Sequence, residues 1–280
     1  MKYKSLLLDV DGTLVPVGPN INPSEKVAEY LKRAKEVASV SLVSGRCLDW
    51  LKELFEVLDL EHPSIINGGS QIIDPRTREI IWERPMQEDS MQSIFKIIDE
   101  NRLRFIISDD GVEFENPSQQ NFSKPLAIKL TYFDSKEESD SCLRSLSEIP
   151  QISAHKVYSW DTARNYKLEI YITHEEATKQ HAARELANIL GVETQEMIGI
   201  GDARNDIPLL NVCGLKVAMG NADSKLKRVA DYIAPSVHED GICDVIEKFI
   251  FNEGDLSKLR ALRPSGSYLF DKLINFFGNH

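Results

Sequence analysis

The sequence predicts an α/β fold: a Rossmann-like core in which a parallel sheet carries helices on both faces, plus an inserted α+β domain. Short apolar runs alternate with amphipathic helical patterns through the first third of the chain, which is typical of βαβ units. This alternation stops near residue 84 and resumes near residue 178. We therefore predict a discontinuous core domain at 1–83 and 178–250, an inserted α+β domain at 84–177 and a C-terminal helical tail at 251–280.

Strands and helices are expected in alternation over the first third. In chain order, the predicted elements are strands at 5–8 and 40–43, a helix at 47–58 and a strand at 64–66, followed by an Asn-Gly turn at 67–68 and a further short strand. Between the first two strands, Asn22 is predicted to cap a helix, with Pro23 at its first position and Glu25 at its third. This order predicts a parallel sheet.

The inserted segment carries a different pattern. In chain order it predicts a helix around 91–98, strands near 105–107 and 127–132, a helix around 142–146, and strands near 152–157 and 167–172. We expect antiparallel pairing among these strands. The parallel pattern resumes with a helix from about 175 to 190, closed by Gly191, and a strand at 197–200.

Composition excludes several classes of function. The 280 residues carry 44 acidic and 33 basic side chains, a formal charge of −11, which is the wrong sign for binding nucleic acid over a broad surface. The four cysteines form no CxxC pair, and Asp9 and Asp11 interrupt the first apolar run before it could span a bilayer. We therefore expect a cytoplasmic protein with no nucleic-acid or membrane partner.

Two aspartates follow the first predicted strand. Asp9 and Asp11 stand at its carboxyl end, before Gly12, where an open parallel sheet places its binding crevice. Two carboxylates this close repel each other unless a cation or a shared proton intervenes, and oxygen-only ligands favour Mg²⁺. An Asp-Gly turn with two solvated carboxylates is the alternative that these residues leave open.

A second acidic cluster follows the strand at 197–200. Asp202 stands at the strand end, and Asn205 and Asp206 fall three and four residues later, on the side of the turn that a starting helix would share with it. Helix capping by Asn205 is the alternative. The cluster is informative because a second predicted parallel strand, like the first, is followed by carboxylates.

Groups able to hold an anion are expected at the same edge. Ser44 and Gly45 follow the strand at 40–43, where a hydroxyl and backbone amides at a strand-to-helix junction favour an anion. Lys179 lies near the start of a helix, and helical side chains lean toward the N-terminus, so its ammonium could reach this edge. Taken singly, a Ser in a loop and a Lys on a helix are most often ordinary surface residues.

Four segments in this order resemble the four motifs of the haloacid dehalogenase-like (HAD) hydrolases. They are Asp9-Val10-Asp11-Gly12-Thr13, Ser44-Gly45-Arg46, Lys179 and Gly201-Asp202-Ala203-Arg204-Asn205-Asp206. The resemblance spans roughly residues 5–245, includes Asn67-Gly68 and Glu239-Asp240-Gly241, and is strongest to the Cof-type phosphatases, which carry an inserted C2-type cap between the second and third motifs. Such proteins often have Gly after the motif lysine, whereas Gln180 and His181 follow here.

The resemblance implies a Mg²⁺-dependent phosphomonoester hydrolase. Asp9 would attack phosphorus to form an aspartyl-phosphate, and Asp11 would act as general acid and then as general base. Asp9, the main-chain carbonyl of Asp11, and Asp202 would hold the metal, and Asp206 would orient the loop or the metal's waters. The residues expected to contact the substrate phosphoryl group are Thr13, Ser44, Gly45, Lys179 and Asn205.

A cap over the site implies a small phosphorylated metabolite, such as a sugar phosphate, as the substrate. Polar loops of the inserted segment supply Lys124, Arg164 and Tyr166 as candidate contacts. A phosphomutase that uses the same aspartates is one alternative, and a non-catalytic module that binds a phosphorylated metabolite is another. The apolar cluster within 268–277 predicts a terminal helix docked on its own core or a dimer contact, so a monomer and a homodimer are both expected possibilities.

Overall fold

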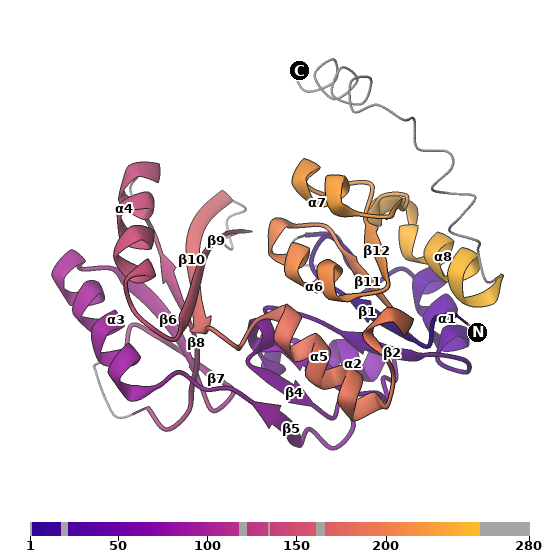
Figure 1. Ribbon diagram of the computed structural model, residues 1–280, viewed down its shortest axis with the longest axis horizontal. Coiled ribbons are helices and arrows are strands. Elements are labelled where there is room, and N and C mark those ends of the chain that lie inside the picture. Colours follow the sequence, from indigo (N-terminus) through magenta and orange to yellow (C-terminus); the bar gives the residue numbers. More distant parts are fainter. Residues whose placement is uncertain (1, 18–21, 118–121, 134, 161–165, 253–280) are drawn as a thin grey trace, which may run out of the picture.

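The structure is a computed structural model that describes residues 2–17, 22–117, 122–133, 135–160 and 166–252. Arg164, the side chain of Tyr166 and nearly all of the predicted tail lie outside the described residues. Figure 1 shows a core built around a parallel sheet and, beside it, a second sheet that carries its own helices. The predicted fold class is confirmed.

The core is organised by a five-stranded parallel sheet of order β13-β12-β11-β1-β2. Its strands are β1 (Ser5–Leu8), β2 (Ser39–Leu42), β11 (Met197–Gly201), β12 (Leu215–Ala218) and β13 (Tyr232–Ile233). In β1, Leu8 pairs with Leu42 on one side and with Ile200 on the other. Because the strands are parallel, the segments that follow β1, β2 and β11 emerge at one edge of the sheet.

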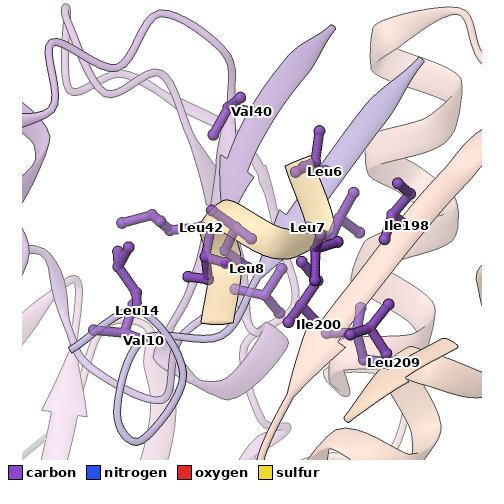
Figure 2. Packing of buried hydrophobic residues seen from close by; sticks show 14 of the residues in the cluster. Leu6, Leu7, Leu8, Val10, Leu14, Val40, Leu42, Ile198, Ile200 and Leu209 are labelled. Carbon is purple, nitrogen blue, oxygen red and sulfur yellow. The ribbon is translucent and has the colours of Figure 1, made fainter. Parts of the chain in front are cut away.

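Apolar side chains explain the central place of β1. Leu6, Leu7 and Leu8 are fully buried, as expected of a parallel strand covered on both faces. Figure 2 shows these leucines packed among the apolar side chains of β2 and β11. The strand therefore orients the loop that begins at Asp9.

Helices cover both faces of the parallel sheet. α1 (Glu25–Ala34) contacts α8 (Gly241–Ile246), α5 (Lys179–Leu190) contacts α6 (Ile207–Val212), and Figure 1 shows the two pairs on opposite sides of the strands. The remaining helices and helical turns of the core are α2 (Lys52–Val57), α7 (Ser224–Val229), η1 (Leu48–Trp50), η2 (Asn67–Gly69), η3 (Thr194–Glu196), η4 (Arg204–Asp206), η5 (Val237–Glu239) and the π-turn η6 (Glu247–Phe251). Within the described part of the chain, no helix combines the length and the apolar character needed to cross a membrane.

The start of α1 differs from the prediction. Ser24, not Asn22, is the N-cap, and its hydroxyl accepts a hydrogen bond from the Val27 N–H (3.2 Å). Asn22 stands two residues too early to reach that donor, because the N-cap side chain bonds to the second or third N–H of the helix. Pro23 therefore precedes the helix.

Two further helices are shorter than predicted. The helix expected from about 175 begins at Lys179, because Thr178 is its N-cap and accepts a hydrogen bond from the His181 N–H (3.3 Å). This start places Lys179 in the first turn of α5. The helix expected at 47–58 is divided at Leu51 into η1 and α2.

A small antiparallel sheet joins the core to the inserted segment. It consists of β3 (Ser64–Ile66), β4 (Gln71–Ile73) and β5 (Ile80–Glu83). The predicted Asn-Gly turn is the helical turn η2, in which Asn67 and Gly68 both have positive φ (49° and 69°). β5 was not predicted from the sequence, and its two isoleucines are exposed.

The inserted segment forms a five-stranded antiparallel sheet of order β7-β6-β8-β10-β9. Its elements are α3 (Glu88–Asn101), β6 (Arg104–Asp109), β7 (Val112–Glu115), β8 (Pro125–Thr131), α4 (Lys136–Ser147), β9 (Ile152–Trp160) and β10 (Tyr166–His174). One face packs apolar side chains against α3 and α4. Figure 1 shows these helices on the side of the sheet away from the core, so the opposite face is turned toward the core.

Leu6→Ala should lower the free energy of unfolding by about 2–5 kcal/mol, because both the lost burial and the remaining cavity destabilise the core. Urea unfolding followed by circular dichroism measures this loss. The matched control is Val37→Ala, at a half-exposed position, for which we expect a change of less than about 0.5 kcal/mol. Equal losses in the two variants would contradict the central position of β1.

Candidate active site

Three carboxylates converge at the carboxyl ends of β1 and β11. Oxygens of Asp9, Asp202 and Asp206 lie within 4.8 Å of one another. Asp9 directly follows β1, and its N–H donates to the Ile200 carbonyl of β11 (3.0 Å). Asp202 follows β11, so the pairing of these two strands accounts for the proximity of residues almost 200 positions apart.

Lys179 connects two of these carboxylates. Its ammonium donates to Asp9 Oδ1 (2.5 Å) and to Asp206 Oδ1 (2.6 Å), and all three side chains are buried. The second oxygen of Asp206 accepts hydrogen bonds from the N–H groups of Asp202 (3.1 Å) and Ala203 (3.0 Å). Asp206 therefore holds both the lysine and the loop that carries Asp202.

Gly12 allows the first loop to approach the second. Its φ is +83°, and a Cβ added there would overlap the Asp202 carboxylate. The Gly12 carbonyl accepts a hydrogen bond from Asn221 Nδ2 (2.8 Å), and the Asn221 side-chain oxygen accepts one from the Val237 N–H (2.9 Å). Sequence reasoning did not identify Asn221, since no motif marks it.

Burial and crowding shift the ionisation of the cluster. Burial and the nearby Asp206 raise the pKa of Asp9 to about 7, although Lys179 opposes this. Burial and the charges of Asp9 and Asp206 raise the pKa of Asp202 to about 8. Burial disfavours the charged form of Lys179, but Asp206 and Asp9 outweigh this effect and raise its pKa overall. The lysine therefore stays protonated.

The cluster has the properties of a divalent-cation site. When ionised, its three carboxylates and the Lys179 ammonium leave two negative charges. Asp202 Oδ1 is buried and has no hydrogen-bond partner among the described residues, a costly state that a bound cation would relieve. All the side-chain ligands that the cluster offers are oxygens, which suit a hard cation.

Asp11 points away from this cluster. Arg46 donates to both of its carboxylate oxygens, from Nε to Oδ2 (3.0 Å) and from Nη2 to Oδ1 (2.6 Å). Its side chain is 43% exposed, against 10% for Asp9, so the two carboxylates diverge at the turn before Gly12. The sequence motif contains Arg46, but its ion pair with Asp11 was not anticipated.

The predicted phosphate-binding residues lie at the carboxyl ends of the parallel strands, but they differ in burial and in hydrogen bonding. Ser44 is buried, and its Oγ accepts a hydrogen bond from the Arg46 N–H (3.0 Å). Thr13 Oγ1 is buried without a partner among the described residues, and a Cβ added at Gly45 would meet open space. Asn205 lies half-buried in η4, and no hydrogen bond described for the chain joins its side chain to the carboxylates.

Side chains of the antiparallel sheet approach the site from the other side. Tyr171 pairs in register with Lys129 and with His155, so these three side chains share the face turned toward the core. The Tyr171 hydroxyl donates to the Gly45 carbonyl (3.3 Å). Burial and the nearby Lys179 lower the pKa of His155 to about 4, so its imidazole is neutral. Period-two alternation could have marked this face.

Of the contacts predicted in the inserted segment, Lys124 is not brought to the carboxylates. Lys124 pairs instead with Glu83 of β5 (2.8 Å) and with Asp110 (3.8 Å), because the segment before β8 runs beside β5. Arg164 and the side chain of Tyr166 lie outside the described residues.

Comparisons with known proteins show which proteins this chain is similar to. Phosphoglycolate phosphatase 1 of Saccharolobus solfataricus is 25% identical over 259 residues, covering 90% of this chain and 98% of the relative. The 5-amino-6-(5-phospho-D-ribitylamino)uracil phosphatase YcsE of Bacillus subtilis is 25% identical over 252 residues, covering 88% and 96%. The solved structure of BT1666 from Bacteroides thetaiotaomicron, from a study of HAD-superfamily phosphatases, superposes with a TM-score of 0.74 at 20% identity, covering 88% and 95%.

The family profile described as haloacid dehalogenase-like hydrolase matches residues 6–125 and 111–246, which include every motif segment named above. The prediction of an enzyme of this class is confirmed. The chain belongs to the haloacid dehalogenase-like hydrolase family.

Proposed function

We propose that this chain is a phosphatase that hydrolyses small phosphate monoesters with Mg²⁺ through a phosphorylated Asp9. The observation that supports this most directly is the position of Asp9, held by Lys179 and adjacent to Asp202. A carboxylate nucleophile must approach a dianionic phosphate, and a lysine with a cation site beside it offsets the repulsion.

The metal would be held by the side chains of Asp9 and Asp202 and by the main-chain carbonyl of Asp11. The oxygen-only donors and the two uncompensated negative charges favour Mg²⁺ over softer metals. When bound, the ion supplies electrostatic neutralisation of the nucleophile and the phosphoryl oxygens. Asp206 would position this set through the Asp202 N–H and Lys179.

The proposed reaction has two halves. In the first, an Asp9 oxygen attacks phosphorus while the bond between phosphorus and the alcohol oxygen breaks, and Asp11 gives its proton to the departing alkoxide. In the second, Asp11 takes a proton from water, whose oxygen attacks the phosphorus, so inorganic phosphate leaves and Asp9 becomes a carboxylate again. Because Arg46 donates to both Asp11 oxygens, Asp11 would exchange this pair for a contact with the leaving oxygen in order to carry the proton.

Groups at the sheet edge would receive the transferring phosphoryl group. Lys179 would offset the negative charge of this phosphoryl group, since its ammonium already contacts the Asp9 nucleophile. The remaining proposed contacts are Thr13, Ser44, Gly45 and Asn205. The unpartnered Thr13 hydroxyl and the open space at Gly45 support a ligand there.

We propose that residues 84–177 act as a cap over a core made of 1–83 and 178–250. The approach of the Tyr171 face to Gly45 supports this role, because a covering sheet excludes water and limits substrate size. The two curated relatives named above are phosphatases of small phosphorylated metabolites, which supports the same substrate class here.

Asp9→Asn should reduce kcat by at least about a thousandfold, because the amide keeps the shape of the side chain but cannot form the intermediate. Release of inorganic phosphate from a panel of phosphate monoesters, without a bisphosphate activator, measures this and separates hydrolysis from a mutase reaction. The matched control is Asp89→Asn in the first turn of α3, an exposed position that should retain wild-type activity. Turnover by a pure Asp9→Asn preparation would refute the nucleophile.

Binding of Mg²⁺ should strengthen as the pH rises, because protons and metal compete for the same carboxylates. Burial first, then the neighbouring carboxylates, raise the pKa of Asp202 from its ordinary value of 3.8 to about 8. Through this group, the metal-free fold loses stability as the pH rises from about 4 to about 8, since the folded state holds the proton more tightly than the unfolded chain does.

Thermal unfolding of wild type and Asp202→Asn, in EDTA and in Mg²⁺, tests this expectation. In EDTA, the stability advantage of the variant should grow between about pH 5 and pH 8. Added Mg²⁺ should stabilise wild type more at the higher pH and have a much smaller effect on the variant. An equal Mg²⁺ effect on both proteins would place the metal elsewhere.

A further inference from the structure

An open hollow lies between the helical segment that follows β2 in the core and strand β7 of the antiparallel sheet. It has a volume of about 520 Å³ and is lined by Cys47, Asp49, Trp50, Lys52, Val112 and Glu113. The first four residues come from the core segment that follows Ser44-Gly45-Arg46, and the last two come from β7 of the antiparallel sheet. The hollow is within the size range of small-molecule sites, about 300–1,000 Å³.

Glu113 organises this hollow through two hydrogen bonds. Its Oε2 accepts from Trp50 Nε1 (3.2 Å), which joins β7 to the core, and its Oε1 accepts from Lys129 Nζ (2.7 Å) of β8. Trp50 is 62% exposed although its ring nitrogen is bonded, so much of the indole surface is free. An aromatic surface beside a fixed carboxylate can stack on the C–H face of a polyol while the carboxylate accepts its hydroxyls.

The hollow adjoins the proposed phosphate site. Cys47, in its wall, is two residues from Gly45, whose carbonyl receives the Tyr171 hydroxyl. Glu113 accepts a hydrogen bond from Lys129, and Lys129 lies beside Tyr171 in the sheet register, which places the carboxylate near the Tyr171–Gly45 contact. From a phosphate held near Gly45, an attached group could reach Glu113 along this face of the sheet.

The charges of the hollow disfavour a second anion. Lys129 is paired with Glu113, and Lys52 is paired with Asp49 (3.2 Å). A carboxylate or second phosphate on the substrate would compete with these pairs and meet Glu113 at close range. A neutral polyol would instead donate hydroxyl protons to the carboxylate, and such charge-assisted bonds are the stronger kind.

We propose that Trp50, Glu113 and Lys129 form a leaving-group subsite that selects phosphate esters of neutral polyhydroxylated alcohols and discriminates against esters that carry a second anion. This inference rests on the proposed phosphatase function. It assigns specificity to residues outside the four motifs and the loop contacts predicted from the sequence.

Kinetics on three kinds of ester test the subsite. The probes are the hexose or polyol monophosphate that wild type hydrolyses best, phosphoglycolate as the ester with a second anion, and p-nitrophenyl phosphate as an ester without hydroxyls. Wild type should have a higher kcat/KM for the polyol ester than for phosphoglycolate. Trp50→Ala should lower kcat/KM for the polyol ester by about tenfold or more, mainly through KM, whereas Trp50→Phe, which keeps a ring, should lose less.

Glu113→Gln gives the sharper result, because it removes the negative charge, keeps the side-chain shape and leaves Lys129 without its partner. The ratio of kcat/KM for the polyol ester over that for phosphoglycolate should fall by about tenfold or more, the value of one hydrogen bond to a charged group. Matched controls are Phe114→Ala, an exposed aromatic on β7, and Glu79→Gln, an exposed carboxylate before β5; both should leave the ratio unchanged.

The outcomes separate the two proposals. The subsite would be overturned if wild type prefers phosphoglycolate. It would also be overturned if Glu113→Gln leaves the ratio unchanged and the Trp50 variants leave KM unchanged. In either case, turnover of p-nitrophenyl phosphate would still support the phosphatase. Absence of turnover on every ester by folded wild type in Mg²⁺ would refute the proposed function and the subsite with it. Thermal unfolding of each variant identifies those that fold.

Discussion

The arrangement of the site depends on one buried ammonium. Lys179 contacts Asp9 and Asp206. Asp9 follows β1, Lys179 follows the inserted segment, and Asp206 follows β11. Burying such charges costs free energy that is recovered only when each charge has a partner in good geometry. The contacts of Lys179 therefore tie the two parts of the core together and define where a cation and a phosphate can approach.

This constraint also explains how a large insertion is accommodated. The chain leaves the core after β5 and returns at Thr178, where the cap of α5 places Lys179 in the first helical turn. Backbone geometry supports that return, because a Cβ added at Gly69 would overlap the main chain of Thr178. The position of the lysine is thus decided by local capping and close packing, and the intervening sheet is free to serve as the proposed cap.

Sequence patterns could predict the elements that local chemistry dictates. The predicted strand at 5–8 matches β1, since a strand buried on both faces carries an apolar run such as Leu6-Leu7-Leu8. Asp9 and Asp202 could be placed together because the carboxyl ends of parallel strands share one edge. Helix starts were less predictable, since Asn22 and Ser24 are both good caps and only the packed structure selects Ser24.

The sequence by itself determined the α/β class, the family and the edge at which the acidic groups gather, because these follow from periodicity, strand order and motifs that lie within a few residues. The tertiary structure alone decided how the side chains divide into pairs: Asp11 with Arg46, and Glu113 with Trp50 and Lys129. These contacts join residues that are 16 to 63 positions apart in the chain. Which partner each side chain pairs with depends on the sheet register and on how closely one sheet approaches the other, and no local sequence pattern encodes either.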